Sequence, residues 1–78
     1  MAHLRFLGPA AAAAGTAHDD IDARTVDEVV SVLAARYGPS LAALLPTCCI
    51  RVNGEEADGT RNLGAHDEVA VLPPMSGG

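Results

Sequence analysis

TVDEVVSVLAARYG, residues 25–38, is the stretch of the sequence that most clearly predicts local structure. Thr25 followed three positions later by Glu28 forms a capping box, and the Glu28 carboxylate also stabilises the positive end of a helix dipole. Gly38 supplies a stop at the other end. These signals predict a helix over residues 26–37.

The apolar residues of this helix recur at steps of three and four, which places them on one face. They are Val26, Val29, Val30, Leu33 and Tyr37. A helix with one apolar stripe buries that stripe against another element, and a small sheet suits this composition. We therefore expect a core helix and not a ligand-binding segment.

Short segments on both sides of the helix alternate between apolar and polar residues, as strands do. The expected strands are residues 3–7, 17–23, 48–52, 55–57 and 68–72. Asn53 and Gly54 tolerate the positive φ angles of a tight hairpin turn. Two short helical turns are also expected, one beginning at Pro9 and one within residues 40–45.

The resulting order, β, β, α, β, β, β, predicts the α+β class, with a mixed sheet of about five strands and one main helix packed on one face. A right-handed crossover through the helix brings the last strand beside the first. Leu4 and Phe6 then face the helix. The alternation places Leu7, Ala70 and Leu72 on the opposite face of the sheet.

Composition limits what such a domain can bind. The chain has 78 residues, 49% of them hydrophobic but with only one Phe and one Tyr, and a net charge of −5. Its few arginines are scattered, so nucleic acid is a poor partner. No stretch reaches the roughly 20 apolar residues of a membrane span, and the first residues lack the pattern of a signal peptide. We expect a cytoplasmic protein that binds no membrane.

Neither the cysteines nor the other potential ligands have the spacing of a metal site. Cys48 and Cys49 are adjacent and are expected to be reduced, partly buried thiols, with redox or metal chemistry as the alternative. The carboxylates near residue 21 lack the calcium-loop pattern and are expected to be solvated. No metal is predicted from these residues or from the histidines: Asp19, Asp20, Asp22, His3, His18 and His66.

The chain closes with VLPPMSGG, residues 71–78. We expect residues 1–72 to form the domain and residues 73–78 to form an extended, flexible tail that continues directly from the last strand. Pro73 and Pro74 favour the polyproline conformation, so the tail would project on the order of 20 Å.

The last two residues, Gly77 and Gly78, have no side chains, so this end of the chain fits a channel too narrow for a β-carbon. The group delivered would be the carboxylate of Gly78. A carboxylate is a poor acyl donor at neutral pH and must first be activated, most simply as an acyl-adenylate made from ATP. The chain has no GxxxxGK[ST] phosphate loop, so activation is assigned to a partner enzyme.

Three segments of the sequence resemble the MoaD branch of the ThiS/MoaD sulfur carriers, which are ubiquitin-like β-grasp proteins. They are VNG at residues 52–54, DEVAVLPP at residues 67–74 and the closing Gly-Gly. The resemblance implies that an E1-like enzyme adenylates the terminal glycine, using ATP, and that a sulfur donor converts it to a thiocarboxylate. In the MoaD branch the sulfur goes to the dithiolene of molybdopterin, in a complex with the large synthase subunit.

Carried over by position, the resemblance makes Gly78 the residue that bears the sulfur and predicts a small, non-catalytic subunit that binds no cofactor itself. The tail inside the partner channel would be Gly77, Ser76, Met75, Pro74 and Pro73. The apolar docking surface would be Leu7, Ala70 and Leu72. Glu56 and His66 depart from the residues common in the family at those positions, which leaves the partner open.

Other functions share the same tail chemistry. The paired prolines favour the MoaD branch over thiamine-type carriers, but carriers that feed sulfur to cysteine or to specialised metabolites have similar tails. A ubiquitin-like modifier would instead form isopeptide bonds through Gly78 to lysines. A plain interaction domain with a tail that does nothing is the remaining alternative.

Overall fold

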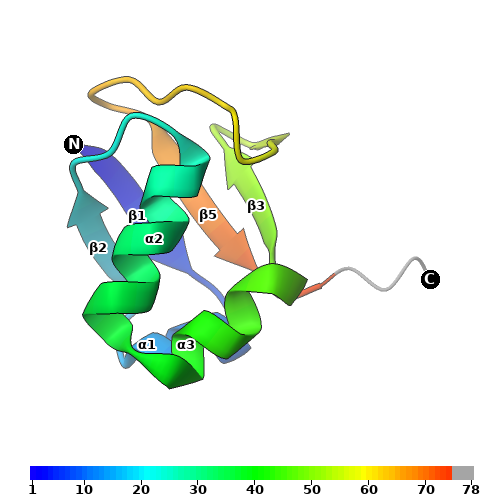
Figure 1. Cartoon of the computed structure of the whole chain (residues 1–78). Coiled ribbons are helices and arrows are strands. Elements are labelled where there is room, and N and C mark those ends of the chain that lie inside the picture. The colour runs from blue at the N-terminus through cyan, green and yellow to red at the C-terminus, as the bar shows by residue number, and fades with distance from the viewer. Residues whose placement is uncertain (75–78) are drawn as a thin grey trace.

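Five strands form one mixed sheet in the computed structural model, which describes residues 1–74 of the chain (Figure 1). The strands are β1 (Ala2–Phe6), β2 (His18–Ile21), β3 (Cys49–Val52), β4 (Glu55–Glu56) and β5 (Glu68–Leu72). Their order across the sheet is β2-β1-β5-β3-β4. β1 and β5 run parallel, and the other neighbours are antiparallel. The predicted α+β class and mixed sheet are confirmed.

The helices lie over one face and one end of this sheet, with α2 crossing in front of the strands and α1 and α3 at their lower end in Figure 1. They are α1 (Pro9–Ala14), α2 (Val26–Tyr37) and α3 (Pro39–Leu44), followed by the 3₁₀ turn η1 (Leu45–Thr47). The helix predicted over residues 26–37 is confirmed at both ends. Its capping box forms in part, since the Thr25 hydroxyl accepts a hydrogen bond of 3.2 Å from the Glu28 amide.

The core lies between α2 and the inner face of the sheet. Alternate residues of the strands are buried there, including Leu4, Phe6, Val69 and Val71, as the period of two requires. Helix α2 contributes the other side of the core through Val26, Val29 and Leu33. Val30 and Tyr37 of the predicted stripe are only partly buried against this cluster. Tyr37 meets the ring of Phe6 edge to face, with the centroids 5.6 Å apart.

The strand ends differ slightly from the prediction. The final strand is found where expected, at Glu68–Leu72, and the hairpin turn has positive φ at Asn53 and Gly54. The first strand is Ala2–Phe6 instead of residues 3–7. Leu7 falls outside it because the chain turns away at the next residue, although the Leu7 amide still donates to the Val71 carbonyl at 3.1 Å.

The expectation that all three aspartates near residue 21 are solvated is wrong for Asp19. Its carboxylate, with 19% of the side chain exposed, accepts hydrogen bonds from Arg36 Nη1 at 2.7 Å and from the Tyr37 hydroxyl at 2.6 Å. Burial raises the pKa of Asp19, but the hydrogen bonds from Tyr37, Arg36 and the Asp20 amide, with the positive charge of Arg36, outweigh it and hold the pKa below its usual value. This cluster joins the last turn of α2 to the edge strand β2.

Leu33 is the fully buried centre of the α2 stripe, so we expect Leu33→Ala to lower the free energy of unfolding by about 2–5 kcal/mol. Val30→Ala should cost less, because Val30 lies at the margin of the core. Urea denaturation followed by circular dichroism measures both. Ser31→Ala, at an exposed position of the same helix, is the control and should stay within about 0.5 kcal/mol of wild type.

Asp19 should make stability sensitive to acid. Because its pKa is lowered on folding, the ionised carboxylate stabilises the protein above the unfolded pKa of about 3.9, and this contribution is lost as the pH falls through the folded pKa. Wild type should therefore be more stable than Asp19→Asn at about pH 6, with a difference that shrinks towards about pH 2. Ser31→Ala, which removes no titratable group at an exposed position, is the control and should show no such trend. A constant Asp19→Asn difference across this range would contradict the assignment.

Candidate functional site

The C-terminal end of β5 is the place where the predicted tail begins. β5 lies between β1 and β3, so the chain leaves from the middle of the sheet (Figure 1). On one side the Leu7 amide donates to the Val71 carbonyl, and on the other Leu72 lies opposite Cys49 in the antiparallel register. The strand is therefore held from both sides up to its last residue.

Of the residues predicted to enter a partner channel, the structure describes the first two. Pro73 is half-buried and Pro74 is exposed, and neither belongs to a strand. Met75, Ser76, Gly77 and Gly78 lie outside the described residues, so their assigned roles remain predictions. The division into a domain of residues 1–72 and a tail of residues 73–78 likewise remains a prediction, although β5 does end at Leu72.

The three residues predicted to form a docking surface lie on the outer face, defined here as the face of the sheet away from α2. Leu7 is 37% exposed, and Ala70 and Leu72 are half-buried. Leu72 follows Ala70 by one full period of the strand, and the Leu7 backbone is bonded to the residue between them. The structure therefore brings the three to the tail end of the outer face. Their part in docking stays a prediction.

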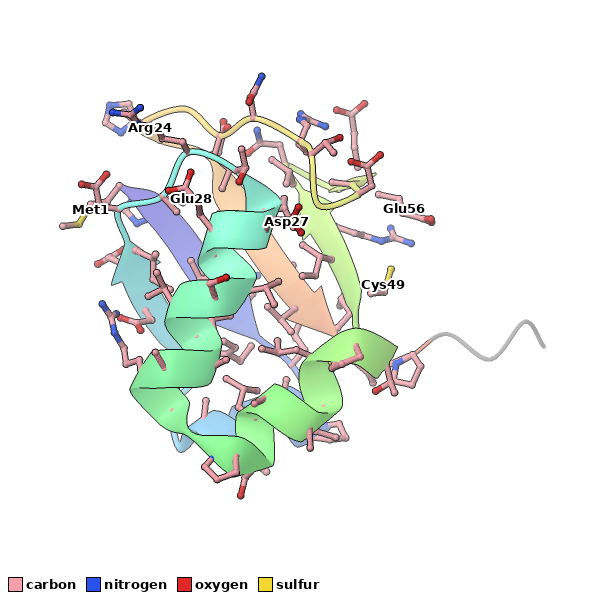
Figure 2. The ribbon with its side chains drawn as sticks, in the orientation of Figure 1. Met1, Arg24, Asp27, Glu28, Cys49 and Glu56 are labelled. Atoms are coloured by element: carbon pink, nitrogen blue, oxygen red, sulfur yellow. The ribbon has the colours of Figure 1, made fainter. Side chains whose placement is uncertain are left out.

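Cys49 also belongs to this apolar group, and the sequence analysis did not predict that it would. It lies opposite Leu72 and is half-buried, at the start of β3 in Figure 2. The alternation within residues 48–52 already places Cys49 and Arg51 on one face of the strand. That Leu72 is the neighbour of Cys49 follows only from the register between β3 and β5. Cys48 packs against the core instead, and burial, followed by the nearby Cys49, raises the pKa of its thiol. Both cysteines are free.

A basic row crosses the outer face next to the apolar group. Arg5 and Arg51 both lie opposite Ala70, one from each neighbouring strand. Strands are about 4.8 Å apart, so the two backbones are separated by about 10 Å. Within residues 1–74 neither arginine forms an ion pair, and the buried Nε of Arg51 has no hydrogen-bond partner. Glu56 of β4 lies opposite Arg51 on its other side, so this face also carries an acidic residue, and only the two arginines favour carboxylates on a partner.

The remaining surface offers little for small-molecule chemistry. An open hollow of about 500 Å³ lies over β1 and β2 and is lined by charged side chains of both signs, including Arg5, Asp20 and Glu68. In the part of the chain that the structure describes, no three His, Cys, Asp or Glu side chains gather closely enough to hold a metal ion. No helix within residues 1–74 is long and apolar enough to cross a membrane.

The start of α2 is the kind of helix end at which anions can bind, but here the chain itself occupies it. The Val26 amide donates to the Arg61 carbonyl at 3.1 Å, and the Asp27 amide donates to the Gly59 carbonyl at 2.9 Å. Figure 2 shows the Asp27 side chain at this end of the helix, beside the loop that precedes β5. The Asp27 and Glu28 carboxylates add negative charge there, which disfavours an anion.

Comparisons with solved structures confirm the β-grasp, ubiquitin-like fold. Small archaeal modifier protein 1 from Haloferax volcanii is 26% identical, with 99% of this chain and 98% of that chain covered and a TM-score of 0.77. One chain in the solved complex of subunits 1 and 2 of molybdopterin-converting factor from Helicobacter pylori is 27% identical. The match covers 99% of this chain and 97% of that chain, with a TM-score of 0.73.

A third structure, CysO from Mycobacterium tuberculosis, is 18% identical, with 96% and 100% covered and a TM-score of 0.81, which shows likeness of fold alone. The search of curated proteins gave no match. The family model described as the ThiS family matches residues 4–78, nearly the whole chain. The chain therefore belongs to the ThiS family of sulfur carriers.

Proposed function

We propose that the protein carries sulfur as a thiocarboxylate on Gly78 and donates it in molybdopterin biosynthesis. The observation that supports this most directly is the end of β5. A central strand, held from both sides, leads into paired prolines beside the apolar group of Leu7, Ala70, Leu72 and Cys49. A tail that starts there leaves the domain next to a surface suited to a partner.

The chemistry divides between the carrier and its partners. A carboxylate oxygen of Gly78 attacks the α-phosphate of ATP and displaces pyrophosphate, and a sulfur nucleophile from the donor then displaces AMP. An E1-like adenylating enzyme binds the ATP, since the first amides of α2 are already occupied in the carrier. The carrier binds no cofactor and does no catalysis, and we place this cycle in the cytoplasm.

The outer face supplies the contact with these partners. Its apolar group would bury against an apolar partner surface, while Arg5 and Arg51 would face carboxylates. The likeness to a molybdopterin-converting factor subunit, solved as a complex of two subunits, supports the large synthase subunit as the sulfur-accepting partner.

Two related functions are the alternatives. The resemblance to small archaeal modifier protein 1 favours a modifier that forms isopeptide bonds through Gly78. A carrier for another product, such as cysteine, thiamine or a specialised thio-metabolite, would use the same fold and the same chemistry at Gly78.

Intact-mass measurement of the protein isolated from its own cells separates these functions. A species heavier by the exchange of one oxygen for sulfur at Gly78 supports a carrier, and its discharge by the large synthase subunit supports molybdopterin. Conjugates linked to lysines support the modifier. The same measurement checks that Gly78 is the terminal residue in the cell, which the proposal requires.

Removal of Gly78, or addition of one alanine after it, should abolish thiocarboxylate formation because the activated carboxylate is then displaced from the reacting position. The free energy of unfolding should be unchanged, since the core ends with Val71. The assay is pyrophosphate release by the E1-like enzyme of the same organism, with mass spectrometry of the product. One residue added before the exposed Met1 is the matched control and should leave the rate intact. Thiocarboxylate formation at the wild-type rate on the C-terminally extended chain would contradict the proposal.

Leu72→Glu should weaken binding to the adenylating enzyme by about tenfold or more, because a charge would enter the apolar group at the base of the tail. The fold should survive, since Leu72 is only half-buried and lies outside the core between sheet and helix. Isothermal titration calorimetry measures the dissociation constant. Ser31→Glu adds the same charge on the exposed side of α2 and should leave binding unchanged. Equal dissociation constants for wild type and Leu72→Glu would show that the docking surface lies elsewhere.

A further inference from the structure

Gly8 lies under the first residue of the predicted tail. A β-carbon placed on Gly8 would lie 3.5 Å from Pro73 Cγ and 3.8 Å from Pro73 Cδ, so the proline ring covers the side of the glycine where a side chain would be. Gly8 also has φ 58° and ψ −132°, a backbone conformation that residues with side chains rarely adopt. It follows Leu7, the first residue after β1, and immediately precedes α1.

Gly38 provides an internal comparison. Like Gly8, it precedes a proline that begins a six-residue helix, and it has φ 82° and ψ −164°. A β-carbon on Gly38 would have nothing within 4 Å. Both glycines therefore stand at a helix start with positive φ, although Gly38 also ends α2, where its amide donates to the Ala34 carbonyl. They differ in that only Gly8 contacts the C-terminal segment.

The contact occurs where the hydrogen-bonded ladder can no longer hold the chain. Pro73 has no amide hydrogen, so β5 cannot continue to pair beyond Leu72. The φ angle of each proline is fixed near −65°, and Leu72, which precedes a proline, is restricted to extended conformations. The rotations that remain are the ψ angles of Pro73 and Pro74 and, within the extended range, the ψ angle of Leu72, which orients the Pro73 ring. Packing of the Pro73 ring over Gly8 limits the last of these rotations.

The geometry points to Gly8 as a positioning residue for the tail: its bare α-carbon seats the Pro73 ring and so sets the direction in which the chain leaves β5. This inference rests on the proposed function, because direction matters only if the tail must enter a partner. A change of direction at Pro73 displaces every residue that follows it. The docking surface on the outer face would be unaffected.

Substitutions at Gly8 separate this role from backbone strain. In Gly8→Ala the added β-carbon makes an ordinary contact with Pro73, so only the strain of the positive φ is introduced. In Gly8→Val the two methyl groups beyond that carbon must displace the proline ring. Gly38→Val introduces comparable strain with no Pro73 to displace. Pro73→Ala removes the ring itself and lies outside every strand and helix.

The first measurement needs no partner. In the isolated protein, a nuclear Overhauser effect between the Gly8 α-hydrogens and the Pro73 ring hydrogens is expected in wild type and in Gly38→Val. In Gly8→Val, the nuclear Overhauser effect between residue 8 and the Pro73 ring hydrogens should be lost, because the ring is displaced. Absence of the wild-type effect would overturn the inference, whatever the protein's function.

The second measurement is the adenylation rate with the E1-like enzyme of the same organism. Gly8→Val should lower kcat by about tenfold while KM stays within about twofold, because docking through the outer face is kept and only the position of the carboxylate is lost. Pro73→Ala should lower kcat by a similar factor. Gly38→Val should retain the wild-type kcat. In the Pro73→Ala background, Gly8→Val should have less than about a twofold further effect, since both changes remove the same contact.

The outcomes distinguish this inference from the proposed function. Fully additive losses for Gly8→Val and Pro73→Ala, or equal losses for Gly8→Val and Gly38→Val, would overturn positioning by Gly8 while the carrier function stands. Wild-type protein that is never adenylated would overturn the proposed function and, with it, the catalytic meaning of the contact. If Gly8→Val does not fold, the Pro73→Ala kinetics decide: an unchanged kcat overturns the inference.

Discussion

The parallel pairing of β1 with β5 is the contact on which the rest of the structure depends. Two parallel neighbours cannot be joined by a tight turn, so the chain between them must cross the sheet, and α2 makes that crossing. The helix therefore covers one face and leaves the other open. The same pairing puts the last strand in the middle of the sheet, with a neighbour on each side up to Leu72.

Local signals were enough to predict α2 and β5, because each is encoded within its own residues: a capping box and a stop for the helix, and strict alternation for the strand. The features missed depend on residues far apart in the chain. Asp19 is bound by Arg36 and Tyr37 across the sheet edge, and Cys49 meets Leu72 only in the final register. Nothing in a strand's own pattern states which residue of another strand lies beside it.

The candidate site divides in the same way. The period of two within each strand predicts that Leu7, Ala70 and Leu72 share a face. Only the parallel register of β1 and β5 shows that they lie close together on that face. The basic row of Arg5 and Arg51 was hidden in the sequence because the two arginines are 46 residues apart and read as scattered charges. Since carriers and modifiers share this fold, the side chains of the outer face, more than the fold, would select the partner.

The two prolines after β5 have a further consequence, which concerns association between copies of the protein. An extended segment that keeps its amide hydrogens can add to the exposed edge of another sheet, and β2 and β4 are such edges here. Pro73 and Pro74 remove two successive donors at the point where the chain leaves the domain. The segment that leaves the domain is therefore a poor strand for pairing with another copy. The charged residues of the edge strands also disfavour such pairing; they are Asp20, Glu55 and Glu56.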